Sequence, residues 1–237
     1  MSAMKRARKV SSEQRVQSLP LRKYILLCAL LGIVLLAGLA MWHQSASPAA
    51  KQAPSLTIDK LPVAFFMHTF DPSSPPADMP PLAAWEEAEC DSNFVSNANV
   101  KGRTEMVDGT HGVVTVTDVK VTLQLAINIW VAEGAAKRVI EHEQGHRRIS
   151  EHYYETADQV AEQIAATYLG KQVSASDGDL NAEVNKLLQQ MGAEITAEYS
   201  QRLNPSLAQN RYDDITDHGR NDFGAEEAVA QVVRDVQ

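Results

Sequence analysis

Cysteine is nearly absent from this sequence of 237 residues, which contains only Cys28 and Cys90. Cys28 lies within a long apolar run, where a cysteine acts as a small apolar side chain. Only Cys90 remains outside that run, and one cysteine cannot form an internal disulfide. A small scaffold held together by disulfides is therefore excluded.

Positive charge is scarce beyond residue 42. The chain there has 15 Lys and Arg against 29 Asp and Glu, a net charge of -14. Nucleic-acid binding requires many basic side chains that neutralise phosphates, so a nucleic-acid partner is not expected. A solvated acidic surface explains this charge more simply than a specific cationic partner does.

One long apolar segment, YILLCALLGIVLLAGLAMW, occupies residues 24–42 without a single charge. A helix of that length nearly crosses a hydrocarbon core of about 30 Å. Residues 1–23 contain seven basic residues and one acid, so we expect a cytoplasmic leader followed by a single-pass signal anchor. Small residues in HQSASPAAK also suit a cleaved signal peptide, but the length of the apolar run favours the anchor.

Proline is concentrated after the anchor, with eight of the ten prolines between Pro48 and Pro81. This composition predicts an extended spacer over residues 43–84, interrupted by an early strand within residues 56–70. We expect the folded domain over residues 85–224. An acidic tail, residues 225–237, has the apolar spacing of a short amphipathic helix.

Two patterns predict the secondary structure of the domain. Apolar and polar residues alternate over 113–130, which predicts a half-buried strand, and 90–103 is a plausible partner across the turn DGTHG. Apolar residues then recur every three or four positions over 132–169 and over 179–205, which predicts two helices. The expected fold is α+β, an antiparallel hairpin or meander followed by two packed helices.

The stretch VIEHEQGHRRI contains the pattern H-E-x-x-H, formed by His142, Glu143 and His146. On a helix, two histidines at i and i+4 can bind one zinc ion, while the glutamate faces the open coordination position as a general base. Both histidines lie in the apolar stripe of the predicted helix. The alternative is a pair of hydrogen-bonded core histidines with a solvated glutamate.

A zinc enzyme needs a third protein ligand, and His218 in the turn-rich segment YDDITDHGRN is the strongest candidate. Beside it, Asp217 is a candidate to orient a ligand, and Tyr212 to donate a hydrogen bond to a developing oxyanion. His152 and Glu155 point away from the site on an unbroken helix. The second helix offers three further carboxylates, Glu183, Glu194 and Glu198.

With these two motifs in this order, the sequence resembles the DUF922 family of bacterial exported proteins, which are described as zinc-dependent proteases. The likeness covers about residues 60–224 and includes Cys90, the strand that ends at Trp130, H-E-x-G-H, and Y-D-x-x-T-x-H-G from Tyr212 to Gly219. It implies a zincin-like site in which His142, His146 and His218 bind zinc and Glu143 is the catalytic acid and base.

The sequence therefore predicts a zinc metallopeptidase held in the bacterial inner membrane by residues 24–42, with its domain in the periplasm. Its partner would be a peptide or protein substrate in the cell envelope. One alternative is a non-catalytic binding or scaffold module, which a fourth protein ligand would favour. Another is zinc-dependent hydrolysis of an amide outside protein, such as one in cell-wall peptide.

Overall fold

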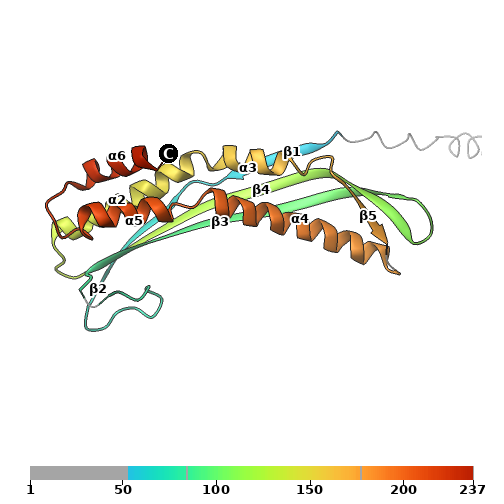
Figure 1. The fold of residues 1–237 in the computed structure, drawn as a ribbon. Helices are drawn as coiled ribbons and strands as arrows, with labels where there is room; N and C mark the ends of the chain where they lie inside the picture. Colours follow the sequence, from blue (N-terminus) through green and yellow to red (C-terminus); the bar gives the residue numbers. More distant parts are fainter. Residues whose placement is uncertain (1–52, 84, 177, 237) are drawn as a thin grey trace, which may run out of the picture. The chain divides into compact units, whose positions relative to one another are not determined.

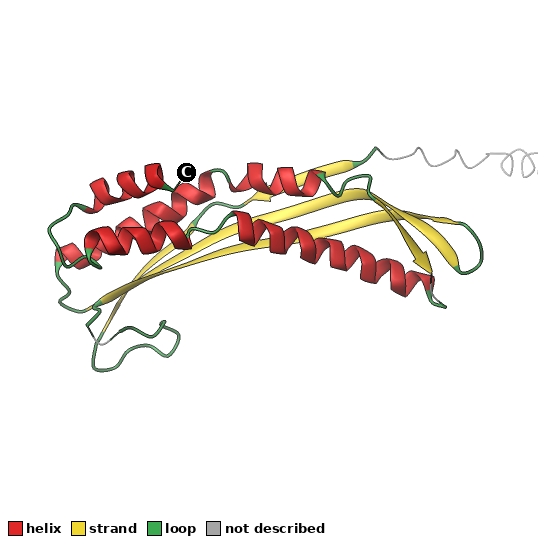
Figure 2. Cartoon of the chain, in the orientation of Figure 1, coloured by secondary structure: helices red, strands yellow, loops and turns green. Residues whose placement is uncertain are grey.

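The computed structural model describes residues 53–236, except for residues 84 and 177. The predicted leader and the anchor at residues 24–42 lie outside this range. Within it, no helix combines the length and the apolar character that a membrane crossing requires. The expected mixture of helices and strands is confirmed, and the strands form one five-stranded sheet (Figures 1 and 2).

Strand β4 (His111–Ala132) is the centre of this sheet. Every second side chain from Val119 to Ile129 is completely buried, as the alternating sequence pattern predicts. Strand β3 (Ala88–Met106) pairs antiparallel with β4 over nearly its whole length. Asp108 stabilises the turn between them, because its carboxylate accepts hydrogen bonds from the backbone N–H groups of Thr110 and His111.

Three short strands pair with other parts of β4. β1 (Ser55–Lys60) and β2 (Ala64–Phe70) run parallel to it, and β5 (Gln172–Ser176) is antiparallel to its first residues. The sheet is thus mixed rather than purely antiparallel. The described residues from 53 to 236 form one compact unit, so the folded part begins within the segment predicted to be a spacer. Proline does not prevent this, because Pro62 lies between β1 and β2.

The helices include α2 (Lys137–Glu155), α3 (Ala157–Ala166) and α4 (Leu180–Arg202). Side chains of α3 and α4 pack on the buried face of β4 and form the main core with it. The single helix predicted over 132–169 is in fact two, α2 and α3. Its apolar stripe continues across the break at Thr156, so periodicity alone cannot reveal the break. Asp179 caps α4 by accepting a hydrogen bond from the N–H of Ala182.

Two shorter helices, α5 (Ser206–Thr216) and α6 (Ala225–Asp235), pack against α2. The sequence predicted a loop where α5 lies, and the acidic tail forms α6. A second core joins the three helices, with Ile149 of α2 against Tyr212 and Val232. This packing brings α5 beside the H-E-x-x-H turn of α2, although the two helices are far apart in the sequence (Figure 1).

Candidate metal centre

Three side-chain atoms meet between α2 and α5. Nε2 of His142 and Nε2 of His146 lie 3.1 Å apart, and Oδ1 of Asp213 is 3.2 Å from the first and 3.0 Å from the second. Two of these side chains come from one turn of α2 and the third from α5. Such a group of two imidazoles and one carboxylate can hold a metal ion.

The hydrogen bonds behind His146 determine where its proton lies. The amide nitrogen of Gln209 donates to the backbone oxygen of His146 at 3.1 Å, and a carbonyl oxygen can only accept. This fixes the orientation of the Gln209 amide. Its oxygen, 2.6 Å from Nδ1 of His146, must therefore accept a hydrogen bond from the N–H at that position. A neutral His146 therefore directs the lone pair of its Nε2 atom toward Asp213.

His142 is oriented in the same way by Thr216. The single hydroxyl proton of Thr216 is donated to the backbone oxygen of Tyr212 at 2.8 Å. Nδ1 of His142, 3.3 Å from that hydroxyl oxygen, must then be the donor between the two. The Nε2 atom of a neutral His142 consequently also presents a lone pair to Asp213.

Three lone pairs thus point into one small space, where they repel each other unless a cation lies between them. Ligand atoms about 2.0–2.1 Å from a small tetrahedral ion are about 3.3–3.4 Å apart, close to the observed separations of 3.0–3.2 Å. The residues present therefore fit a metal ion. The hydrogen bonds to Gln209 and Thr216 are of the kind that orients histidine ligands in metal sites.

Without a metal, a proton takes the place of the ion. Burial alone would lower the pKa of His146, but the hydrogen bond and charge of Asp213 outweigh it and raise this pKa to about 9. Burial lowers the pKa of His142, although a protonated ring would donate a hydrogen bond from Nε2 to Asp213. Although burial opposes ionisation of Asp213, its hydrogen bonds to both histidines hold the pKa of this carboxyl below its usual range.

Two glycines allow the helices and the following loop to approach the histidines. A Cβ atom on Gly145 would lie 2.0 Å from the hydroxyl oxygen of Tyr212, so only glycine lets Tyr212 stack on the ring of His142. Gly219 has φ +72°, and a Cβ atom there would come within 2.8 Å of that ring. These contacts explain both glycines in H-E-x-G-H and T-x-H-G.

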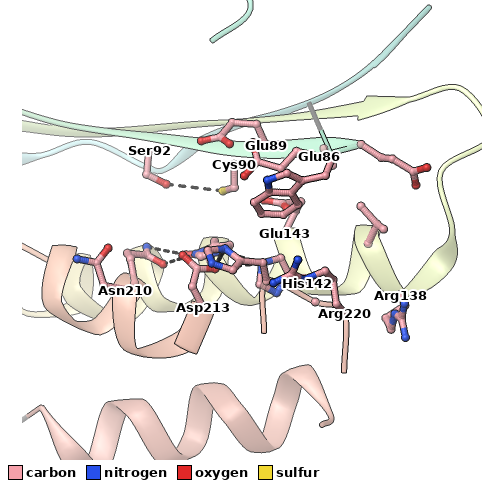
Figure 3. A pocket seen from close by; sticks show the side chains of 18 of the residues that line it. Glu86, Glu89, Cys90, Ser92, Arg138, His142, Glu143, Asn210, Asp213 and Arg220 are labelled. Atoms are coloured by element: carbon pink, nitrogen blue, oxygen red, sulfur yellow. Dashed lines mark hydrogen bonds and ion pairs between the residues drawn. The ribbon is translucent and has the colours of Figure 1, made fainter. Parts of the chain in front are cut away.

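A cleft of about 480 Å³ opens beside the three ligand atoms (Figure 3). Glu143 lines it and is only 6% exposed. Burial raises the pKa of the Glu143 carboxyl to about 7 against the lowering effect of the His146 charge, and the charges of Glu89, Asp213 and Glu86 add smaller raising contributions. A carboxyl with a pKa near neutrality suits both acceptance and donation of a proton.

Cys90 also lines the cleft, from the β3 side. Burial, together with the charge of Glu143, raises the pKa of its thiol to about 12. Because the thiolate and not the thiol is the nucleophile, Cys90 is unsuited to nucleophilic catalysis here.

The structure brings some of the predicted site residues together and leaves His218 outside the metal group. His142, Glu143 and His146 come together as expected. Asp213 occupies the third corner, where the sequence predicted His218. His218 lines the cleft, but its Nδ1 atom is 3.7 Å from Oδ1 of Asp213, its side chain is 44% exposed, and it does not belong to the group that can hold a metal.

The contacts of Tyr212 and Asp217 also differ from the roles that the sequence predicts for them. Tyr212 is fully buried and donates its hydroxyl proton to the backbone oxygen of His142, so it supports the histidine rather than facing the cleft as an oxyanion donor. Asp217 ends α5 in a left-handed conformation and pairs with Arg220 rather than with a ligand. The other carboxylates considered, Glu155, Glu183, Glu194 and Glu198, and the imidazole of His152 are also outside the group.

Sequence reasoning missed Asp213 and Gln209. The sequence contains a signal for Asp213. Tyr212 and Thr216 are four residues apart, the spacing of neighbours on one helix face, which favours a helix that includes Asp213. Comparisons with protein-family models, curated proteins and solved structures find no match to this chain. The resemblance to the DUF922 family therefore stays a prediction that rests on the motifs.

Proposed function

We propose that this chain is a zinc-dependent metallopeptidase. The observation that carries the proposal is the convergence of three lone pairs, from His142, His146 and Asp213, beside a cleft that also contains the buried carboxyl of Glu143. Zinc suits this donor set, because it accepts neutral imidazole nitrogen and carboxylate oxygen in tetrahedral geometry.

A zinc ion held there would lower the pKa of a coordinated water to about 7 and polarise the carbonyl group of a substrate. Glu143 follows His142 on α2 and lines the same cleft, which supports its proposed role as the base that takes the proton of the attacking water. Its pKa of about 7 also suits the return of that proton to the leaving amine. Gln209 and Thr216 keep the two histidines in the required tautomer throughout.

The open side of the site supports an enzyme rather than a scaffold module. A structural zinc site is closed by four protein ligands, whereas a catalytic site has three and leaves one position free. Among the described residues the group contains three ligands, and the cleft lies beside them. His218 is the nearest candidate for a fourth ligand, so its substitution separates the two functions.

The proposal includes the location of the enzyme. We infer from residues 24–42 and the basic residues before them that the chain is anchored in the bacterial inner membrane with its catalytic unit in the periplasm. A peptide or protein of the cell envelope would then be its substrate. An amide in cell-wall peptide has the same bond and is the second substrate to test.

The test is hydrolysis of a mixed peptide library by the zinc-loaded full-length chain, read by mass spectrometry. We expect Glu143→Gln to retain zinc and to lower the rate at least about 100-fold, because the substitution removes the general base. Glu162→Gln, at an exposed position on α3, is the matched control and should leave the rate unchanged. Equal rates for wild type and Glu143→Gln would contradict the proposed mechanism. No hydrolysis by the zinc-loaded wild type would favour the scaffold module.

A further inference from the structure

One wall of the cleft is strongly acidic. Glu86 and Glu87, just before β3, and Glu89, within it, line the cleft from the strand side. Figure 3 shows Glu86 and Glu89 beside the strand, with His142 and Asp213 on the helical side. These three glutamates are not ligands of the metal group, and the proposed mechanism uses Glu86 and Glu89 only through the raising effect of their charges on the pKa of Glu143.

The three glutamates of the acidic wall form no ion pair with another described residue, although Arg138 and Arg220 line the same cleft. The two arginines that line the cleft pair with other acids, Arg138 with Asp222 at 3.7 Å and Arg220 with Asp217. None of the ion pairs between described residues includes Glu86, Glu87 or Glu89. Glu86 accepts a hydrogen bond from the backbone N–H of Ala83, which orients its carboxylate but leaves its charge in place.

Two other observations indicate that this space receives a ligand. Glu143 opens into the cleft, is 6% exposed, and forms no ion pair with any described residue. Trp85 borders the same cleft with half of its surface exposed, and the guanidinium of Arg220 lies 4.9 Å from the centre of its ring, so this ring already contacts one cationic side chain. An aromatic surface beside carboxylates suits a side chain that has an apolar stem and a positive end.

Lysine and arginine have this combination of a methylene stem and a cationic head. We propose that the cleft binds peptides with a lysine or arginine next to the scissile bond, its stem along Trp85 and its charge facing Glu86, Glu87 and Glu89. This inference rests on the proposed peptidase function and names the substrate class of the same site. An acidic residue at that position would be repelled by the wall, which adds discrimination against it.

Binding can be measured without hydrolysis in the zinc-loaded full-length Glu143→Gln variant. We would compare three labelled peptides that differ at one position beside the scissile bond, with lysine, norleucine or glutamate there, by fluorescence anisotropy. We expect the lysine peptide to bind about fivefold more tightly than the norleucine peptide, and the glutamate peptide to bind most weakly. Norleucine has a similar stem without the charge, so the ratio of the dissociation constants of the norleucine and lysine peptides measures the effect of the charge alone.

The acidic wall is then removed by adding Glu86→Gln, Glu87→Gln and Glu89→Gln to the same variant. The preference for lysine over norleucine should disappear, whereas the exposed control Glu162→Gln should preserve it. Trp85→Ala should weaken the lysine and norleucine peptides by the same factor, because it removes apolar contact and no charge. Equal binding of the lysine and norleucine peptides to the parent variant would overturn the inference.

The two proposals fail in different ways. Hydrolysis by the zinc-loaded wild type without a preference for lysine or arginine would overturn the charge selection and leave the peptidase function standing. Charge-selective binding without any hydrolysis would overturn the peptidase function and leave a cleft that selects cationic peptides.

Discussion

Gln209 and Thr216 each bind the Nδ1 atom of a histidine whose Nε2 atom faces Asp213. These two residues do not contact the expected position of the metal, yet they decide which nitrogen has the lone pair. Ser150 extends this network, because it accepts from Gln209 and donates to Ser92 on β3. The ligand geometry therefore depends on side chains from α2, α5 and the sheet together.

Gln209→Met should weaken zinc binding by about 10- to 100-fold, because the nearly isosteric side chain cannot accept a hydrogen bond from Nδ1–H of His146. Competition with a chromogenic chelator measures the affinity. Gln190→Met, on the exposed side of α4, is the matched control and should bind zinc like the wild type. Unchanged affinity in Gln209→Met would mean that the tautomer of His146 is fixed by something else.

Zinc binding near pH 7.5 should release one proton from His146, in addition to what a coordinated water with a pKa of about 7 loses. The pKa of His146 is raised to about 9 in the metal-free site, so this histidine is protonated at pH 7.5 and must lose its proton to bind zinc. His142 has a lowered pKa and Asp213 a pKa below its usual range, so both are already deprotonated. The apparent affinity should accordingly rise with pH up to about 9.

Isothermal calorimetry in two buffers of different ionisation enthalpy measures this proton directly. A binding enthalpy that is the same in both buffers would show that no proton is released, and would contradict the raised pKa of His146 in the metal-free site.

The sequence predicts the part of the site that lies within one helix. His142, Glu143 and His146 follow from helical spacing alone, since residues four apart share one face. Asp213 comes from another helix, and its position depends on how α5 packs on α2, which a single sequence does not contain. The segment around Asp213 is polar, and this composition predicts a loop that presents His218.

At the scale of whole elements, strand β4 was predictable because one of its faces is buried and the other is not. Its antiparallel neighbour β3 precedes it closely in sequence and is joined to it by a short turn, so local pattern suffices there as well. The parallel pairing of β1 and β2 with β4 is different. It joins segments far apart in the chain and depends on the proline-rich stretch folding back, and neither pattern nor composition encodes that register.

The contact between α2 and α5 should be sensitive to the volume at Gly145. In Gly145→Ala the new Cβ atom meets the hydroxyl of Tyr212, so one helix must shift. We expect a loss of about 1–3 kcal/mol in the free energy of unfolding, with weakened zinc binding because α5 carries Asp213. Urea denaturation measures the stability.

Gly109→Ala is the control for this change, because a Cβ atom on Gly109 would meet no atom within 4 Å. Its effect should stay within about 0.5 kcal/mol. If Gly145→Ala were as stable as Gly109→Ala, the close approach of Tyr212 to α2 would be wrong.

At the scale of the molecule, the site joins two helices that the sequence separates widely, α2 and α5, above a sheet that includes residues from the predicted spacer. A metal ion between them would bind the folded chain and not the unfolded one. Folding and metal binding are therefore linked, and removal of the metal should lower stability.

Free zinc at 100 times its dissociation constant should stabilise the chain by about 2.7 kcal/mol. For a folded unit of this size, that corresponds to a rise of about 5–10 °C in the midpoint of thermal unfolding. A chelator should reverse the rise in the wild type and have no effect in His142→Ala. Differential scanning calorimetry with and without chelator tests this, and an identical midpoint in both conditions would contradict the linkage.

The central claim is that His142, His146 and Asp213 hold one zinc ion, and zinc content per purified chain tests it most directly. We predict one zinc in the wild type, loss of zinc in His142→Ala and Asp213→Ala, and retention in His218→Ala. Retention in Asp213→Ala together with loss in His218→Ala would contradict the ligand set. A correctly folded wild type without zinc would contradict the metal centre itself.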